Sequence, residues 1–174
     1  GIDTRIVNYH HTTIPDGFPR ERVLKVNTPE EIEKYKYSEK DHLERWEKFN
    51  KFIKELTNNE QNVYTSEEAL EKVELDYWIC GSDQIWNTDI TRGINKGFFL
   101  DFDTTGKKIS YAASMGIPRL EEKYEADFVN AVNNIDAVSV REDALKEYIN
   151  SLTDKEVEKV VDPTLLLEKE DYND

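Results

Sequence analysis

The chain has 174 residues, of which 37% are hydrophobic, 11% aromatic and 34% charged, and its formal net charge is -14. The length and apolar content are sufficient for one domain with a hydrophobic core. They exclude a chain that is disordered along its whole length. The negative charge argues against a general nucleic-acid binder or a binder of anionic membranes, because both need a cationic surface. No apolar run approaches the ~18 residues that a membrane span needs.

The start of the chain and its single cysteine favour a cytoplasmic location. The first residues, GIDTRIVNYHH, lack a basic segment followed by an apolar one, so we expect no secretory signal. Cys80 is the only cysteine, which excludes an intrachain disulfide. Residues 81–141 are the least acidic part, with seven basic and nine acidic side chains. This balance suits an anionic ligand, but deeper burial of the segment explains it equally well.

The amino-terminal third predicts one strand and two helices. Residues 4–9, TRIVNY, alternate apolar and polar side chains, as a strand does. Thr28, followed by proline and two glutamates, is a typical helix start. Apolar residues recur at every third or fourth position from about Glu39 to Leu56, which predicts an amphipathic helix that packs against the core.

The remaining residues alternate between predicted strands and helices. Helices are expected from residue 65, where a capping pattern occurs, over residues 120–135 and over residues 141–152. The predicted strands are LDYWICG (75–81), which should be buried, GFFLDF (97–102), KKISYAAS (107–114), AVSV (137–140) and EKVVD (158–162). This alternation predicts an α/β unit with a mostly parallel sheet.

A polar segment, GSDQIWN (81–87), follows the predicted strand that ends at Cys80. The crevice of a parallel sheet opens at the carboxyl ends of its strands, where the chain must turn sharply. Gly81 permits this turn and a close approach of the backbone. Ser82 and Asp83 are favoured helix N-caps, although Asp83 can instead face the crevice.

The second part of this segment carries groups that suit either a ligand or the core. Gln84 and Asn87 have amides that can bind a polar ligand, whereas Trp86 offers a stacking surface or a core anchor. From these residue types alone, a structural role is favoured over catalysis, because Gly-Ser-Asp is common in turns.

Several blocks, in this order, resemble the polysaccharide pyruvyl transferase family. They are GSDQIWN, then FFLDF and KKISYAASMG, then AVSVRED and finally VVDPTLLL, with the lead-in YTSEEALEKVELDYWIC. The resemblance covers roughly residues 40–170 and is specific because several blocks agree. It implies one Rossmann-like half of a GT-B-type fold, in which two such halves face a cleft. The first strand and helix and the whole second half of the family are absent, so we expect residues 1–174 to form a single incomplete domain that is inactive by itself.

The resemblance also implies a reaction. The family moves a pyruvyl group from phosphoenolpyruvate to a sugar diol, forming a ketal and phosphate, in polysaccharide biosynthesis. The implied partners are a small-molecule donor, a saccharide acceptor and the missing half; no further cofactor is implied. The acceptor sugar and the oligomeric state are not specified. Two alternatives are half of a GT-B glycosyltransferase that uses a nucleotide sugar and a non-catalytic saccharide-binding domain.

Three charged residues are the catalytic candidates that the resemblance implies. Arg141, directly after AVSV, would bind the phosphoenolpyruvate anion, because a guanidinium binds two oxygens in one plane. The alternative is a surface arginine paired with Glu142 or Asp143. Asp83 would accept a proton from the sugar hydroxyl or orient it. Asp162 would line the cleft, or alternatively hold a turn before a proline.

The remaining polar candidates have weaker indications. Ser114 lies among small residues, so packing is favoured over ligand contact. Cys80 is expected to be a buried strand residue and not a nucleophile. No metal site is predicted, because the adjacent side chains of His10 and His11 diverge on a strand and no zinc spacing occurs.

Overall fold

The computed structural model describes residues 3–9, 43–45, 47–49, 51–52 and 63–172 of the chain. The chain divides into two compact units. One comprises Gly1–His10 and Ile14–Tyr64, and the other comprises His11–Thr13 and Thr65–Asp174.

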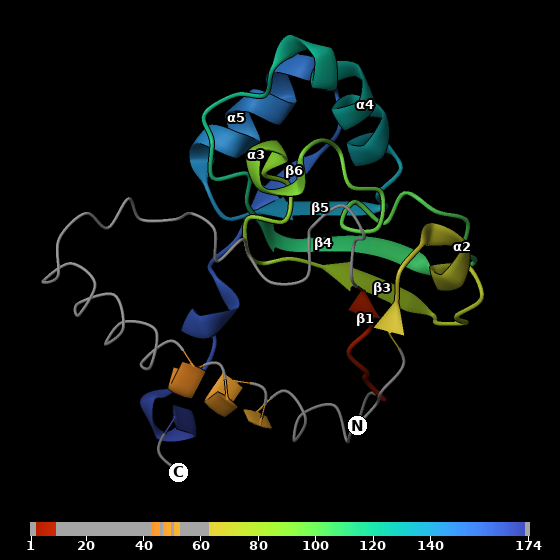
Figure 1. Cartoon of the computed structure of the whole chain (residues 1–174). Coiled ribbons are helices and arrows are strands. Elements are labelled where there is room, and N and C mark those ends of the chain that lie inside the picture. The colour runs from red at the N-terminus through yellow and green to blue at the C-terminus, as the bar shows by residue number, and fades with distance from the viewer. Residues whose placement is uncertain (1–2, 10–42, 46, 50, 53–62, 173–174) are drawn as a thin grey trace, which may run out of the picture. The chain divides into compact units, whose positions relative to one another are not determined.

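The first unit contains a short pair of parallel strands and helical residues. Strand β1 (Asn8–Tyr9) pairs with β2 (Val63–Tyr64), so the predicted strand over residues 4–9 is confirmed only for its last two residues. The described residues between 43 and 52 are helical, as predicted (Figure 1). Leu43 and Phe49 are exposed there, so the predicted packing of this apolar stripe is not seen among the described residues. The predicted helix start at residue 28 lies outside the described residues.

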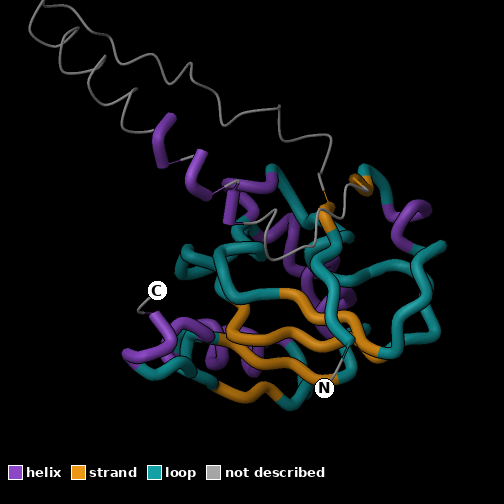
Figure 2. The backbone as a smooth tube through the Cα atoms, turned by 90° about the horizontal axis from the view of Figure 1, so that it is seen from below, coloured by secondary structure: helices purple, strands orange, loops and turns teal. Residues whose placement is uncertain are grey.

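The second unit is built on a four-stranded sheet, in which every pair of neighbours is parallel. Its strands, in sheet order, are β3 (Tyr77–Cys80), β4 (Lys107–Ala113), β5 (Ala137–Val140) and β6 (Val157–Lys159). Figure 2 shows these strands lying side by side. The predicted α/β class with a parallel sheet is confirmed, and the arrangement is consistent with a Rossmann-like fold.

Helices connect the strands of the second unit. Their bounds are α2 (Glu67–Leu70), α3 (Thr88–Thr91), α4 (Glu122–Asn133), α5 (Asp143–Leu152), and the short 3-10 helices η1 (Pro163–Leu165) and η2 (Lys169–Tyr172). Helices α4 and α5 lie on one side of the sheet (Figure 1). The three helices predicted between residues 65 and 152 are confirmed by α2, α4 and α5.

An aromatic cluster forms the centre of the core between the sheet and the helices. The rings of Trp86 and Phe99 stack with centroids 4.9 Å apart and an interplanar angle of 8°. Phe128 of α4 meets Trp86 edge-on, at a centroid distance of 6.1 Å. Val138 and Val140 supply the sheet side of the same cluster. The cluster therefore joins the loop after β3 to the helical layer.

Three strand predictions in the second unit are wrong in part or in whole. The strand predicted over residues 158–162 is confirmed only for Glu158 and Lys159, because β6 ends at Lys159. Residues 97–102 form no strand; the backbone turns there, with Phe99 N donating to the Asn95 carbonyl (3.1 Å). Phe99 and Phe102 are nonetheless buried. The run of apolar residues therefore correctly indicated a buried segment, but not a strand. Strand β3 is also not fully buried. It lies at the end of the sheet order, and Tyr77 and Ile79 are 62% and 67% exposed, although Trp78 is buried.

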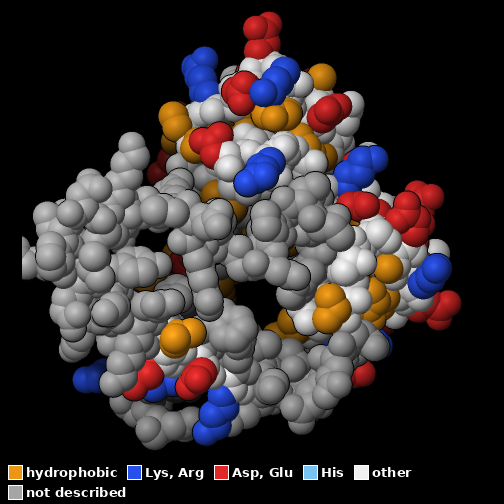
Figure 3. All heavy atoms as spheres, viewed as in Figure 1, with side chains coloured by type: hydrophobic (Ala, Val, Ile, Leu, Met, Phe, Trp, Pro, Cys, Tyr) orange, Lys and Arg blue, Asp and Glu red, His pale blue; other side chains and the backbone are white. Residues whose placement is uncertain are grey.

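The described surface carries both signs of charge. Figure 3 shows basic and acidic side chains interspersed over the visible face of the helical layer. Of the helices that the structure describes, none combines the length and the apolar character that crossing a membrane requires.

Truncating Phe128 tests the contribution of the aromatic cluster. We expect Phe128→Ala to lower the free energy of unfolding by about 3–5 kcal/mol, because the ring is fully buried and its removal leaves a cavity. Urea denaturation measures the change, with Asp127→Ala, an exposed neighbour on α4, as the control. A loss of less than about 1 kcal/mol for Phe128→Ala would contradict this role, because such small losses are typical of surface positions.

Candidate active site

The parallel sheet brings the predicted site residues to one rim. Because its four strands run in the same direction, the loop after β3, Ser114, Arg141 and Asp162 all follow carboxyl ends of strands. Two backbone hydrogen bonds connect the segments, from Ser114 N to the Asp83 carbonyl (3.2 Å) and from Arg141 N to the Ala113 carbonyl (3.1 Å). The loop after β3, Ser114, Arg141 and Asp162 therefore lie along one rim of the sheet.

The loop after β3 needs glycine at its first position. Gly81 has φ 126°, and a Cβ there would collide with the carbonyl of Tyr111 on β4. The peptide bond between Gly81 and Ser82 is cis. The close approach of the backbone that was expected of Gly81 is present.

Neither Ser82 nor Asp83 caps a helix, so this predicted role is wrong. The chain first makes a tight turn, with Asn87 N donating to the Gln84 carbonyl (3.1 Å), and α3 begins only at Thr88. Asn87 is the N-cap, and its Oδ1 accepts from Asp89 N (3.0 Å). Asp83 is exposed on the rim, where its Oδ1 accepts from the backbone N–H of Gln84 (2.7 Å). Its carboxylate is therefore accessible to a ligand.

Trp86 and Asn87 are the buried side chains of this loop. Trp86 is 0% exposed and its Nε1 donates to the Phe98 carbonyl (3.3 Å), so it is a core anchor and has no free ring face. Asn87 is buried and its Nδ2 donates to Gln84 Oε1 (2.8 Å). The side chain of Gln84 in turn packs against Gly116, where a Cβ would collide with it. Burial leaves Trp86 and Asn87 no surface for the expected ligand contacts, whereas Gln84 is half-buried and its ligand contact stays a prediction.

Arg141 is the cation at the centre of the rim. Its Nη1 donates to Asp162 Oδ2 (2.9 Å) and its Nε donates to Glu142 Oε1 (2.9 Å). These two carboxylates, Asp162 first, raise the pKa of Arg141, so the guanidinium stays charged. Its side chain is 31% exposed. The ion pair with Glu142, one of the two alternatives that the sequence allowed, is present. The Arg141 side chain nevertheless remains partly exposed to solvent.

Asp162 is held from two sides. Its Oδ1 accepts from the hydroxyl (2.7 Å) and the backbone N–H (3.0 Å) of Thr164, which makes it the N-cap of η1. The Thr164 hydroxyl and then Arg141 lower the pKa of Asp162 to about 2. The predicted turn role before Pro163 is confirmed. Such a weakly basic carboxylate is poorly matched to general-base catalysis near neutral pH.

Sequence reasoning did not identify the connection between Ser114 and Glu142. Ser114 is fully buried, and its Oγ donates to Glu142 Oε1 (2.9 Å), the same oxygen that accepts from Arg141. Glu142 Oε2 is buried and has no hydrogen-bond partner among the described residues. No spacing in the sequence relates two residues 28 positions apart. Only the pairing of Ala113 with Val140 in neighbouring strands brings them together.

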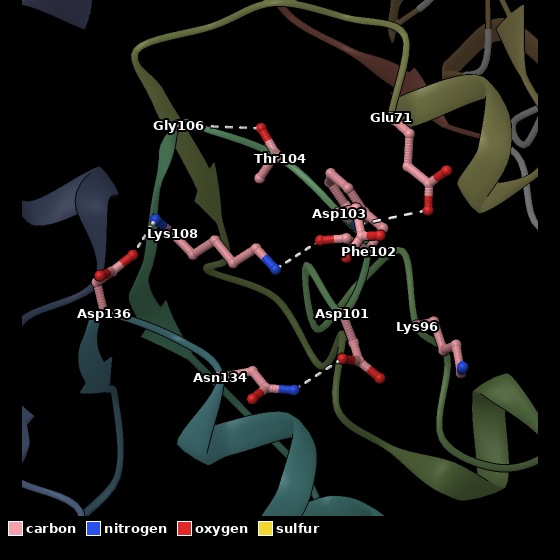
Figure 4. Close-up of a pocket in the computed structure, with 10 residues that line it drawn as sticks. All are labelled: Glu71, Lys96, Asp101, Phe102, Asp103, Thr104, Gly106, Lys108, Asn134 and Asp136. Atoms are coloured by element: carbon pink, nitrogen blue, oxygen red, sulfur yellow. Dashed lines mark hydrogen bonds between the residues drawn. The ribbon is translucent and has the colours of Figure 1, made fainter.

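A hollow of about 550 Å³ lies at the opposite rim of the sheet (Figure 4). Lys108 at the start of β4 and Asp136 just before β5 line it. The polar groups of the hollow bond mainly to each other, for example Asn134 Nδ2 to Asp101 Oδ1 (3.0 Å) and Lys108 Nζ to the Phe102 carbonyl (2.6 Å). None of the residues predicted to form the site lines it, so it is separate from the candidate site.

The described residues show no grouping of His, Cys, Asp and Glu that could hold a metal ion. Burial raises the pKa of the Cys80 thiol to about 12, which disfavours the thiolate near neutral pH. His10 and His11 lie outside the described residues.

The fold and rim define a class of protein, and a comparison then identifies the family. The parallel sheet carries a guanidinium, carboxylates and a glycine turn at the carboxyl ends of its strands. Open α/β sheets bind polar ligands at this place. The family model of polysaccharide pyruvyl transferase matches residues 1–174, and the chain belongs to this family. No curated protein and no solved structure matches the chain.

Titration of Asp162 tests the geometry of the rim. We expect its pKa at about 2 and expect Thr164→Val to raise it, because the hydroxyl that stabilises the charged form is removed. Because the folded pKa is depressed, the stability that Asp162 contributes is complete above pH ~4 and is lost as the pH falls through about 2. Carboxyl-carbon NMR measures the shift, with Thr105→Val, at an exposed threonine, as the control. An unchanged pKa in Thr164→Val would contradict the described hydrogen bond.

Proposed function

We propose that the protein transfers a pyruvyl group from phosphoenolpyruvate to two hydroxyls of a sugar and forms a cyclic ketal in polysaccharide biosynthesis. The family match over residues 1–174 carries this proposal. The common rim of Asp83, Arg141 and Asp162 supports it, because a polar crevice is where such a reaction takes place in this kind of sheet.

The reaction balances without a redox step. A proton adds to the methylene carbon of phosphoenolpyruvate, which becomes the methyl group and leaves an oxocarbenium-like centre at the neighbouring carbon. Two sugar oxygens form bonds to that carbon, and its bond to the phosphate oxygen breaks. Of the two hydroxyl protons, one balances the proton on the methyl carbon and the other leaves with phosphate. The reaction therefore needs an acid, an anion-binding group and an acceptor for a hydroxyl proton.

Arg141 is our candidate for the anion-binding group. A guanidinium has five N–H donors, and the structure describes two of them as bonded, one to Glu142 and one to Asp162. The remaining donors have no partner among the described residues, and the side chain is partly exposed. A carboxylate or phosphate oxygen of the donor can therefore join the guanidinium without breaking either existing bond.

Asp83 is our candidate for the group that orients or deprotonates a sugar hydroxyl. Its carboxylate is exposed on the rim, and its bond to the Gln84 N–H orients it while one oxygen remains available. Asp162 acts through its bond to Arg141, because its depressed pKa makes it a poor base. The described rim is acidic around Arg141, so a multiply charged donor needs cations in addition to Arg141, and the reaction needs an acid in addition to Asp83 and Asp162.

The defining experiment compares donors. We expect the intact protein to release phosphate from phosphoenolpyruvate only when a sugar diol, such as a methyl hexopyranoside, is present, and we expect the product to show a ketal carbon by NMR. A nucleoside diphosphate sugar supplied in its place should not react. Transfer from the nucleotide sugar would instead support the glycosyltransferase alternative. Binding of the glycan without either transfer would support a non-catalytic saccharide-binding domain.

Replacing Arg141 with lysine tests its assigned role. We expect Arg141→Lys to raise the KM for phosphoenolpyruvate by roughly tenfold to hundredfold, because lysine cannot hold Glu142, Asp162 and the donor in one plane. Phosphate release at varied donor concentration measures the change. Arg45→Lys, at an exposed arginine of the other unit, is the matched control. If the donor KM and the rate of phosphate release are unchanged in Arg141→Lys, Arg141 does not belong to the site.

A further inference from the structure

We propose that Glu142 is a positioning residue, which holds the guanidinium of Arg141 in one orientation for the anionic donor. Its consequence for donor binding rests on the proposed function, whereas the restraint on Arg141 can be measured without it. The contacts of one carboxylate oxygen carry the inference, since Glu142 Oε1 accepts from both Ser114 Oγ and Arg141 Nε, each at 2.9 Å.

Ser114 gives Glu142 a rigid support. Its side chain is fully buried, its N–H donates to the Asp83 carbonyl (3.2 Å) and its own carbonyl accepts from Trp86 N (3.2 Å). Trp86 is in turn anchored in the aromatic core. The buried Ser114 hydroxyl thus connects the Glu142 carboxylate to the core and to the loop after β3.

Two bonds at different nitrogens then restrain Arg141. Glu142 holds Nε and Asp162 holds Nη1, both at 2.9 Å. A planar guanidinium that is bonded at two nitrogens cannot turn about its side-chain bonds without breaking one of them. Its unpaired N–H groups consequently keep a constant direction. Ordering the donor-binding group before the donor arrives lowers the entropy cost of binding.

A purely structural role explains Glu142 less well. Asp162 already neutralises Arg141, so Glu142 places a second negative charge on the same cation. Its Oε2 is also buried without a partner among the described residues, which is unfavourable for a carboxylate. A feature that costs stability and breaks a local packing rule is expected where it serves function. Restraint of Arg141 is the function that these contacts support.

The test uses Glu142→Gln in the intact protein. Glutamine keeps the shape and one acceptor oxygen but loses the charge, so the restraint on Nε–H should weaken while the fold persists. In the wild type we expect a resolved, slowly exchanging 15Nε–H signal from Arg141, assigned by its loss in Arg141→Lys. In Glu142→Gln we expect this signal to exchange several times faster and the KM for phosphoenolpyruvate to rise roughly tenfold, with a smaller change in kcat.

Two further variants separate positioning from folding. Ser114→Ala removes the support of Glu142 and should change both readouts in the same direction as Glu142→Gln. Glu147→Gln, at an exposed glutamate on the same helix, should change neither. Thermal unfolding of each variant shows whether the fold is retained; if Glu142→Gln does not fold, Ser114→Ala carries the test.

The outcomes distinguish this inference from the proposed function. Faster exchange together with a raised donor KM supports the inference. An unchanged Nε–H signal in both variants overturns the restraint, and a changed signal with unchanged donor KM overturns its role in donor binding. If the wild type does not use phosphoenolpyruvate, the proposed function fails. The restraint on Arg141 is then tested separately, by following the NMR signal with inorganic phosphate as the probe anion.

Discussion

The parallel alignment of β3, β4, β5 and β6 is the constraint on which the rest of the site depends. It places every strand-to-helix connection on one rim, so residues that are far apart in the sequence become neighbours. The ion pair between Arg141 and Asp162 is the clearest result, because it joins the ends of β5 and β6 across 21 positions of the chain. In an antiparallel sheet the same two segments would leave at opposite rims.

The core and the rim are mechanically connected through the loop after β3. Trp86 anchors the loop in the core by stacking on Phe99. The backbone N–H of the buried Ser114 donates to the Asp83 carbonyl of the same loop. The Ser114 hydroxyl donates to Glu142, which also accepts from Arg141, so both charged side chains are connected to this loop by hydrogen bonds. The aromatic cluster therefore does more than stabilise the fold, since it also determines where the charged groups of the rim lie.

The electrostatics of the rim favour a selective anion site over a strong one. One guanidinium is balanced by two carboxylates, so the described rim lacks the excess of positive charge that would attract anions without discrimination. Its remaining donors are few and directed, which suits recognition of a planar carboxylate or phosphate edge.

The sequence by itself determined the class of the fold, the helices α4 and α5, the strands β4 and β5 and the position of the glycine turn, because hydrophobic period and turn chemistry are local properties. It also indicated Arg141, Asp83 and Asp162, through the resemblance of their sequence blocks to the polysaccharide pyruvyl transferase family. It misassigned residues 97–102 as a strand, because buried turns and strands share the same apolar composition. Only the tertiary structure decided that Trp86 belongs to the core and that Ser114, Glu142, Arg141 and Asp162 form one hydrogen-bonded network, because these contacts arise from the pairing of strands and not from spacing along the chain.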